Sequence, residues 1–173
     1  RELCQMILDM KDESSESILA FDHCLGGGAT AYLDGKEREH VERGDAVTIV
    51  RNDLQNNCFW LCFQSKYLEK KYRVEKFDDL ITISKYLHFD TIYINELVTY
   101  PVLRNILPSI IMLKKQQEAK LVMLFHDYFA ICPSINLMTP EHEYCGLPAG
   151  EICKKCYESN PYSQIYGISD VSE

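Results

Sequence analysis

Apolar residues recur along the chain with two different periods, and the alternation between these periods predicts a sheet flanked by helices. Short apolar runs rich in β-branched residues, typical of strands, occur at 17–22, 46–50, 91–94 and 121–125. Apolar residues at helical spacing occur at 29–42, 77–87 and 100–117. This succession favours parallel strands joined by right-handed crossovers. We therefore predict an α/β, Rossmann-like fold with a mostly parallel sheet flanked by helices.

Local signals refine this outline at four points. Two strand-like runs, 58–63 and 67–74, are separated by a short polar break, which predicts an antiparallel hairpin. Gly44 is expected to end the helix at 29–42, and Asp78 is expected to cap the helix at 77–87. Pro108 lies inside the last helical pattern, and we expect it to kink or divide that helix.

The run at 121–125 has the apolar character of a strand that is covered on both faces, so we predict that it lies at the centre of the sheet. It leads directly into His126 and Asp127, which are polar and able to exchange protons. We take these two residues as candidate catalytic side chains. An alternative interpretation is that they only hydrogen-bond to the backbone at the end of the strand.

Ligands of open α/β sheets bind beyond the carboxyl ends of the strands, so the loops that follow the strands should converge on one crevice. Three loops qualify, at 22–28, 95–100 and 126–134. The first loop contains consecutive glycines, whose bare backbone allows a ligand to approach closely. The candidate binding residues in the first two loops are Gly26, Gly27, Gly28, Asn95 and Glu96.

Charge and hydropathy narrow the class of protein. The formal charge of −8 and the lack of any basic run argue against a nucleic-acid partner. The sequence contains no apolar segment long enough to span a bilayer and no signal-peptide pattern, so we expect a cytoplasmic location, extending to the inner membrane surface. The chain begins without Met and its segments 1–16 and 158–173 are polar, and we expect it to be a piece of a longer protein.

Four of the eight cysteines cluster within 132–156, which we predict to be a cysteine-rich loop. The last two form a C-x-x-C motif, a spacing that lets two thiolates reach one ion. The four candidate ligands of a structural zinc ion are Cys132, Cys145, Cys153 and Cys156. Their overall spacing matches no standard zinc ribbon, so free thiols and disulfides stay open as alternatives.

A dinucleotide site is an alternative use of the first loop. Gly26, Gly28 and Ala31 fit a loose G-x-G-x-x-A fingerprint, and Asp53 beyond the second strand is placed to bind a ribose. The hairpin that follows the second strand and the sparse apolar face of the first helix do not favour this interpretation. It would make the chain a nucleotide-binding oxidoreductase domain.

Three segments carry a resemblance to a known family. They are FDHCLGGGATAYL, INELVTYPVLRNIL and LVMLFHDYFAICPSINLM, the last followed by the clustered cysteines. Together they resemble retaining glycosyltransferases of the GT-B architecture, in the family called group 1 or family 4, and in particular a bacterial branch that builds surface polysaccharides. The resemblance covers roughly residues 17–157, and the His-Asp-Tyr-Phe-x-x-Cys-Pro segment is its most specific part.

The resemblance implies that residues 17–157 are the acceptor-side, amino-terminal lobe of a two-lobed enzyme. The glycine loop would approach the phosphates of a nucleotide-sugar donor, and His126 would lie near the reacting sugar. The acceptor would be a glycan or a lipid-linked glycan. A second lobe would hold most of the donor, and the acidic motif of the family belongs to that lobe, so we expect this lobe alone to be inactive. A third interpretation is a zinc-stapled interaction module without catalytic activity.

Overall fold

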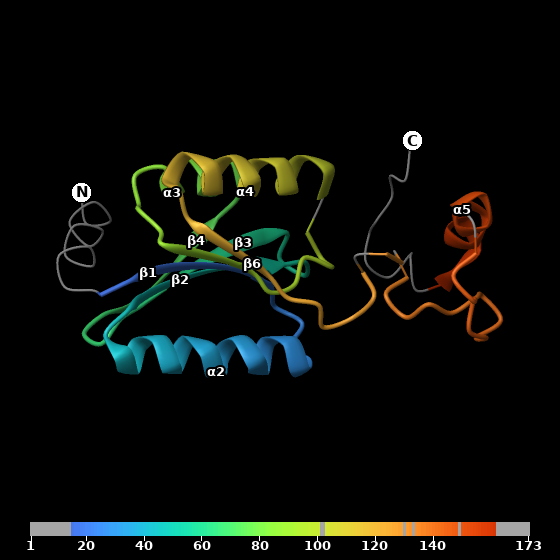
Figure 1. Cartoon of the computed structure of the whole chain (residues 1–173), viewed down its shortest axis with the longest axis horizontal. Helices are drawn as coiled ribbons and strands as arrows, with labels where there is room; N and C mark the ends of the chain where they lie inside the picture. The colour runs from blue at the N-terminus through green and yellow to red at the C-terminus, as the bar shows by residue number, and fades with distance from the viewer. Residues whose placement is uncertain (1–14, 101–102, 130, 133, 149, 162–173) are drawn as a thin grey trace. The chain divides into compact units, whose positions relative to one another are not determined.

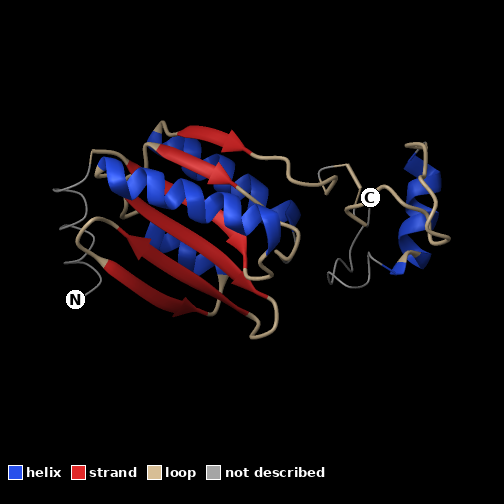
Figure 2. Cartoon of the chain, turned by 90° about the horizontal axis from the view of Figure 1, so that it is seen from below, coloured by secondary structure: helices blue, strands red, loops and turns tan. Residues whose placement is uncertain are grey.

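Hydrogen-bonded pairing joins six strands into one sheet with the order β4-β3-β2-β1-β5-β6. The strands are β1 (Ser17–His23), β2 (Ala46–Asp53), β3 (Cys58–Gln64), β4 (Glu69–Val74), β5 (Thr91–Ile94) and β6 (Lys120–Met123). Strands β2, β1, β5 and β6 are mutually parallel, whereas β3 and β4 form an antiparallel hairpin beside β2 (Figure 2). The predicted mostly parallel α/β sheet and its hairpin are therefore confirmed.

The computed structural model describes residues 15–100, 103–129, 131–132, 134–148 and 150–161. Its helices are α2 (Gly27–Arg43), α3 (Phe77–Ser84), α4 (Leu103–Gln117) and α5 (Gly150–Ser159). Helix α2 covers one face of the sheet, and α3 and α4 cover the other (Figure 1). The chain divides after Leu124 into two units, and the cysteine-rich segment and α5 belong to the second. Most of the predicted polar segments 1–16 and 158–173 lies outside the described residues.

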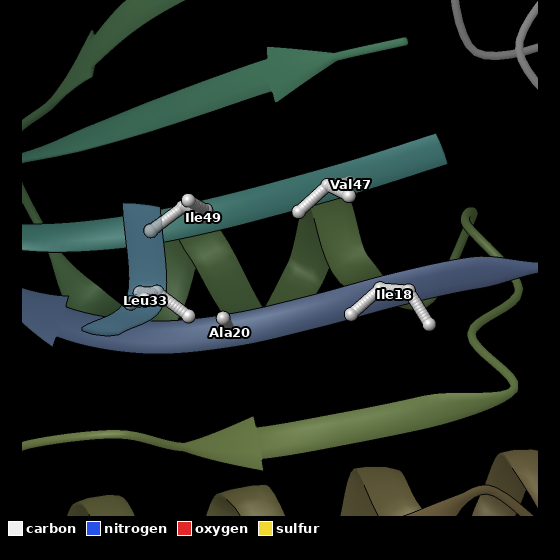
Figure 3. Close-up of a cluster of buried hydrophobic side chains, with 5 residues drawn as sticks. All are labelled: Ile18, Ala20, Leu33, Val47 and Ile49. Carbon is white, nitrogen blue, oxygen red and sulfur yellow. The ribbon is translucent and has the colours of Figure 1, made fainter. Parts of the chain in front are cut away.

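The core forms around β1, which is buried on both faces. Ile18 and Ala20 of β1 pack with Val47 and Ile49 of β2 beneath Leu33 of α2 (Figure 3). The alternate β1 side chains turn to the opposite face, where the ring of Phe21 lies 6.1 Å from that of Phe77 on α3. A strand that is covered by helices on both sides has no need of alternating polarity, which explains its continuous apolar run.

Strand β6 is not central, and this part of the prediction is wrong. It pairs with β5 and lies at the end of the strand order, and Met123 is 44% exposed. The strand also ends before Phe125, which is 70% exposed. An apolar run of this length is compatible with either position, because strand order depends on long-range pairing and not on local composition.

Of the two predicted helix-end signals, one is confirmed and the other is wrong. Gly44 ends α2 in a left-handed conformation (φ 91°), as predicted. Helix α3 is capped at Lys76 without a side-chain hydrogen bond, so Asp78 lies in the first turn instead of at the cap. Helix α4 continues through Pro108, so the proline does not divide it. The burial of Ile110 and Leu113 after the proline offsets the backbone hydrogen bond that proline cannot make.

A buried polar cluster joins the end of α2 to the start of β2. The carboxylate of Asp45 accepts hydrogen bonds from the Ser15 hydroxyl (3.1 Å) and the Arg43 guanidinium (2.9 Å), and Nδ1 of His40 lies 2.8 Å from it. Burial of this carboxylate opposes its ionised form, but the bonds from His40, Arg43 and Ser15 outweigh burial and lower the pKa of Asp45. The cluster therefore stabilises the fold in the ionised state of Asp45.

We expect Asp45→Asn to lower the free energy of unfolding at pH 7 by about 1 to 3 kcal/mol, because it weakens a buried, charge-assisted set of hydrogen bonds. Because the pKa of Asp45 is lower in the folded state than in the unfolded state, its ionised carboxylate stabilises the fold at pH values above the unfolded-state pKa. This stabilisation is lost as the pH falls through the folded-state pKa. The difference between variant and wild type should therefore shrink below about pH 4. Urea denaturation at several pH values measures this difference in the free energy of unfolding. Glu39→Gln, which breaks the exposed pair with Lys36, is the control and should change stability little.

Candidate functional site

The candidate site of the first unit lies at the carboxyl ends of β1, β2 and β5. Strand register sets this arrangement, because His23 pairs with Asn52 of β2 and Phe21 pairs with Ile94 of β5. The loops that follow these positions therefore start at the same edge of the sheet. This is the edge at which ligands of open α/β sheets bind.

The glycine loop forms the start of α2. Gly26 and Gly27 have φ values of 80° and 87°, a left-handed region that favours glycine, and the helix begins at Gly27. No side chain caps this end of the 17-residue helix, and its first turn contains no acidic residue. Apart from the adjacent residues and the nearby backbone of its own helix, a methyl group added at Gly26, Gly27 or Gly28 would meet no atom within 4 Å. The loop thus combines a positive helix end, backbone N–H groups and open space, which suits an anion.

Asn95 fixes this loop to the sheet. Its amide nitrogen donates to Oδ1 of Asp22 (2.9 Å) and to the backbone carbonyl of Ala29 in the first turn of α2 (3.1 Å). Asn95 is 1% exposed and Asp22 is fully buried. The observed role of Asn95 is therefore to position the glycine loop, and a direct contact between Asn95 and a ligand stays a prediction.

Glu96 has a similar local role. Its carboxylate accepts hydrogen bonds from the backbone N–H groups of Leu97 (2.8 Å) and Val98 (3.0 Å), and its side chain is buried. These bonds shape the turn after β5. In the same loop, the Tyr100 hydroxyl donates to the Val50 carbonyl at 2.7 Å. Burial raises the pKa of Tyr100 well above its ordinary value, so this donor keeps its proton.

Asp53, the candidate ribose ligand of the dinucleotide alternative, is engaged within its own turn. Oδ1 accepts from the backbone N–H of Asn56 (3.0 Å), and Oδ2 accepts from the Asn56 amide (2.8 Å) and the Trp60 indole (3.0 Å). The bonds from Asn56 and Trp60 lower the pKa of Asp53. Because both oxygens already support the β2–β3 turn, this geometry does not favour a dinucleotide site.

His126 and Asp127 belong to the second unit. The side chain of His126 is exposed. Oδ1 of Asp127 accepts a hydrogen bond from the backbone N–H of Phe129 (2.8 Å), which is a local turn interaction of the kind that short acidic side chains make. A catalytic role for the pair, and its predicted convergence with the glycine loop, stay predictions.

The four clustered cysteines line one cavity of about 600 Å³ in the second unit, but they do not form a metal site as they stand. All four are free thiols, and Cys153 and Cys156 lie on α5 instead of in the predicted loop. Cys132 contacts the Ser134 hydroxyl (3.0 Å), and Cys156 accepts from the Asn160 amide (3.5 Å). Over the described parts of the chain, no three His, Cys, Asp or Glu side chains are grouped to hold an ion. Zinc binding would require the thiols to converge.

Comparisons with models of protein families, with curated proteins and with solved structures found no match. The resemblance to GT-B glycosyltransferases therefore rests on the sequence motifs alone. In the part of the chain that is described, no helix is both long and apolar enough to cross a membrane.

The sequence did not single out Asp22 as a site residue, although it lies at the centre of this edge. Its Oδ2 atom is buried and has no hydrogen-bond partner among the described residues. The sequence held one signal that could have pointed to Asp22, a carboxylate directly after the four apolar residues of a buried strand. Burying a carboxylate costs free energy unless a hydrogen-bond partner or a ligand compensates for the lost water.

The sequence predicts one zinc ion per chain in the cysteine cavity. Metal analysis of chain purified under reducing conditions should then find one equivalent, and Cys153→Ser should remove it, because a thiolate ligand is lost. Cys24→Ser, which removes an exposed thiol of the first unit, is the control and should keep the metal. A wild-type chain without stoichiometric metal would show that the cavity is lined by free thiols only.

Proposed function

We propose that the first unit is the acceptor-side lobe of a retaining GT-B glycosyltransferase and that its glycine loop binds phosphate groups of a nucleotide-sugar. The observation that carries the proposal is the start of α2, where three glycines leave an uncapped helix end open to a ligand. The resemblance of the sequence motifs to glycosyltransferases is the reason for assigning this function to the proposed anion site. In such an enzyme, a second α/β lobe would face this edge of the sheet.

The proposed reaction transfers a sugar from the nucleoside diphosphate to an acceptor hydroxyl with retention. The bond between the anomeric carbon and the phosphate oxygen breaks, a bond from that carbon to the acceptor oxygen forms, and the proton of the acceptor hydroxyl passes to the departing phosphate. Negative charge grows on the departing phosphate, so fixed N–H dipoles at the start of α2 would stabilise the transition state more than the substrate. Asn95 contributes by holding the first turn of α2 in place through Ala29.

His126 would act on the sugar, with Asp127 orienting the segment. The side chain of His126 is exposed, and an imidazole can hydrogen-bond to a sugar hydroxyl or transfer a proton. Asp127 supports the turn that presents it, through the bond to Phe129. The zinc proposed for the cysteine cavity would have a scaffold role in the second unit and no role in the chemistry.

Gly28→Ala tests the phosphate site with little risk to the fold. Gly28 has neither a left-handed backbone nor a neighbour that would clash with a methyl group, so the variant should be as stable as wild type or more so. The methyl group would occupy space that a phosphate needs beside the backbone. We expect binding of UDP, GDP or pyrophosphate to weaken by about tenfold or more, measured by isothermal titration calorimetry.

Gly35→Ala provides the matched control, since Gly35 lies in the middle of the same helix and also has room for a methyl group. It should raise the free energy of unfolding by about 0.5 to 1 kcal/mol and leave nucleotide binding unchanged. Equal binding by both variants, or no binding by the wild-type chain, would contradict the phosphate site.

The role of His126 is tested by sugar transfer in the protein expressed from its full reading frame. His126→Ala should lower kcat by about 10² to 10⁴ with a smaller effect on nucleotide binding, as expected for a group that acts mainly in the transition state. His88→Ala is the comparison, because His88 is exposed and lies just before β5, away from the carboxyl edge. Equal kcat values for both variants would show that His126 only shapes its loop.

A further inference from the structure

The second unit leaves large apolar side chains exposed around the cavity that the four clustered cysteines line. Ile131, Leu147 and Ile152 line the same cavity, and they are 63%, 55% and 58% exposed. Single exposed apolar residues are ordinary on a protein surface, whereas three of them on one cavity form an apolar wall in contact with water. A folded unit gains free energy when such a wall is removed from water. Closing the cavity would therefore stabilise the second unit.

Helix α5 forms part of this wall without burying any of its residues. All ten residues of α5 are described, and none is buried. Isolated helices of this length are marginal in water, and helices in proteins are stabilised mainly by packing an apolar face. Ile152 and Cys156 are four residues apart, so they lie on one face of α5, and both line the cavity. The face of α5 that is available for packing is thus the face that carries a thiol.

Each exposed apolar side chain of the wall lies close in the chain to a candidate zinc ligand. The pairs are Ile131 with Cys132, Leu147 with Cys145, and Ile152 with Cys153. Zinc binds thiolates at about 2.3 Å, so the sulfur atoms of a four-thiolate site lie within about 4 Å of one another. The thiols are not grouped in this way among the residues that the structure describes. Bringing them to one ion would carry the neighbouring apolar side chains toward the same centre.

We propose that zinc binding and closure of this cavity are one event, which makes the second unit a metal-dependent fold. The four thiols converge on the ion, the cavity shrinks, and Ile131, Leu147 and Ile152 become buried around the site. Part of the free energy of zinc binding is then the hydrophobic free energy of this burial. The inference rests on the zinc site that the cysteines predict, and it does not depend on the transferase function.

The test measures zinc affinity in a variant that keeps all four thiols. Ile152→Asn removes an apolar side chain that closure would bury, and Asn and Ile have similar helix propensities. We expect zinc binding to weaken by about tenfold, because a large polar side chain replaces an apolar one in the closed unit. Competition with a chromophoric chelator under reducing conditions measures the affinity.

Ile111→Asn is the matched control. Ile111 is also an exposed isoleucine on a helix, but it lies on α4 in the first unit and does not line the cavity. This variant should bind zinc as tightly as wild type. A difference between the two asparagine variants therefore reports burial at the zinc site and not a general effect of losing an isoleucine.

Closure itself is measured separately from binding. The dye 8-anilinonaphthalene-1-sulfonate binds exposed apolar surface, so chain freed of metal with a chelator should bind the dye. One equivalent of zinc should displace most of the dye and slow amide hydrogen exchange in α5. Cys153→Ser should retain the dye when zinc is added, whereas Cys24→Ser, in the first unit, should respond as wild type.

Three results would overturn the inference: no stoichiometric zinc binding, zinc binding with neither dye release nor protection of α5, or equal zinc affinity of the two asparagine variants. The outcome is separable from the proposed function. A chain that closes on zinc but binds neither UDP, GDP nor pyrophosphate would support closure and refute the phosphate site. The reverse pattern would refute closure alone.

Discussion

Strand β1 pairs with β2 on one side and β5 on the other while helices cover both of its faces, and the candidate site depends on this double constraint. Burial on both faces fixes the register, because a slip by one residue would exchange the two faces that pack against α2 and α3. The fixed register in turn places Asp22 beside Asn95, and Asn95 holds the first turn of α2. The geometry of the glycine loop thus follows from the packing of the core.

The sequence was sufficient for the elements and for much of the topology of the first unit. Periodicity and turn residues located the strands and helices because these signals are local, as with Gly44 at the end of α2. The position of β6 was not accessible in this way. Its apolar residues resemble those of β1, and only pairing across the sheet distinguishes an edge strand from a central one.

The candidate site was predictable only in part, for a similar reason. Consecutive glycines are visible in the sequence and indicate close approach of a ligand, whereas the bond from Asn95 to Ala29 joins residues 66 positions apart. The four cysteines are close together in the chain, and they line one cavity. Spacing alone could not show that Cys153 and Cys156 lie on a helix, or how their side chains are directed.

The two helices that begin at the carboxyl edge of the sheet, α2 and α3, differ in the charge of their first turns. The start of α2 has no acidic residue in its first turn, so its positive end stays available to an anion. The start of α3 carries Asp78 and Asp79 in its first turn, which occupy the positive end of that helix, and Glu75 adds a further negative charge beside it. A phosphate group would therefore be attracted to the start of α2 and repelled from the start of α3. Under the proposed transferase function, this difference in charge would leave the start of α2 as the place at which the phosphates of the donor bind.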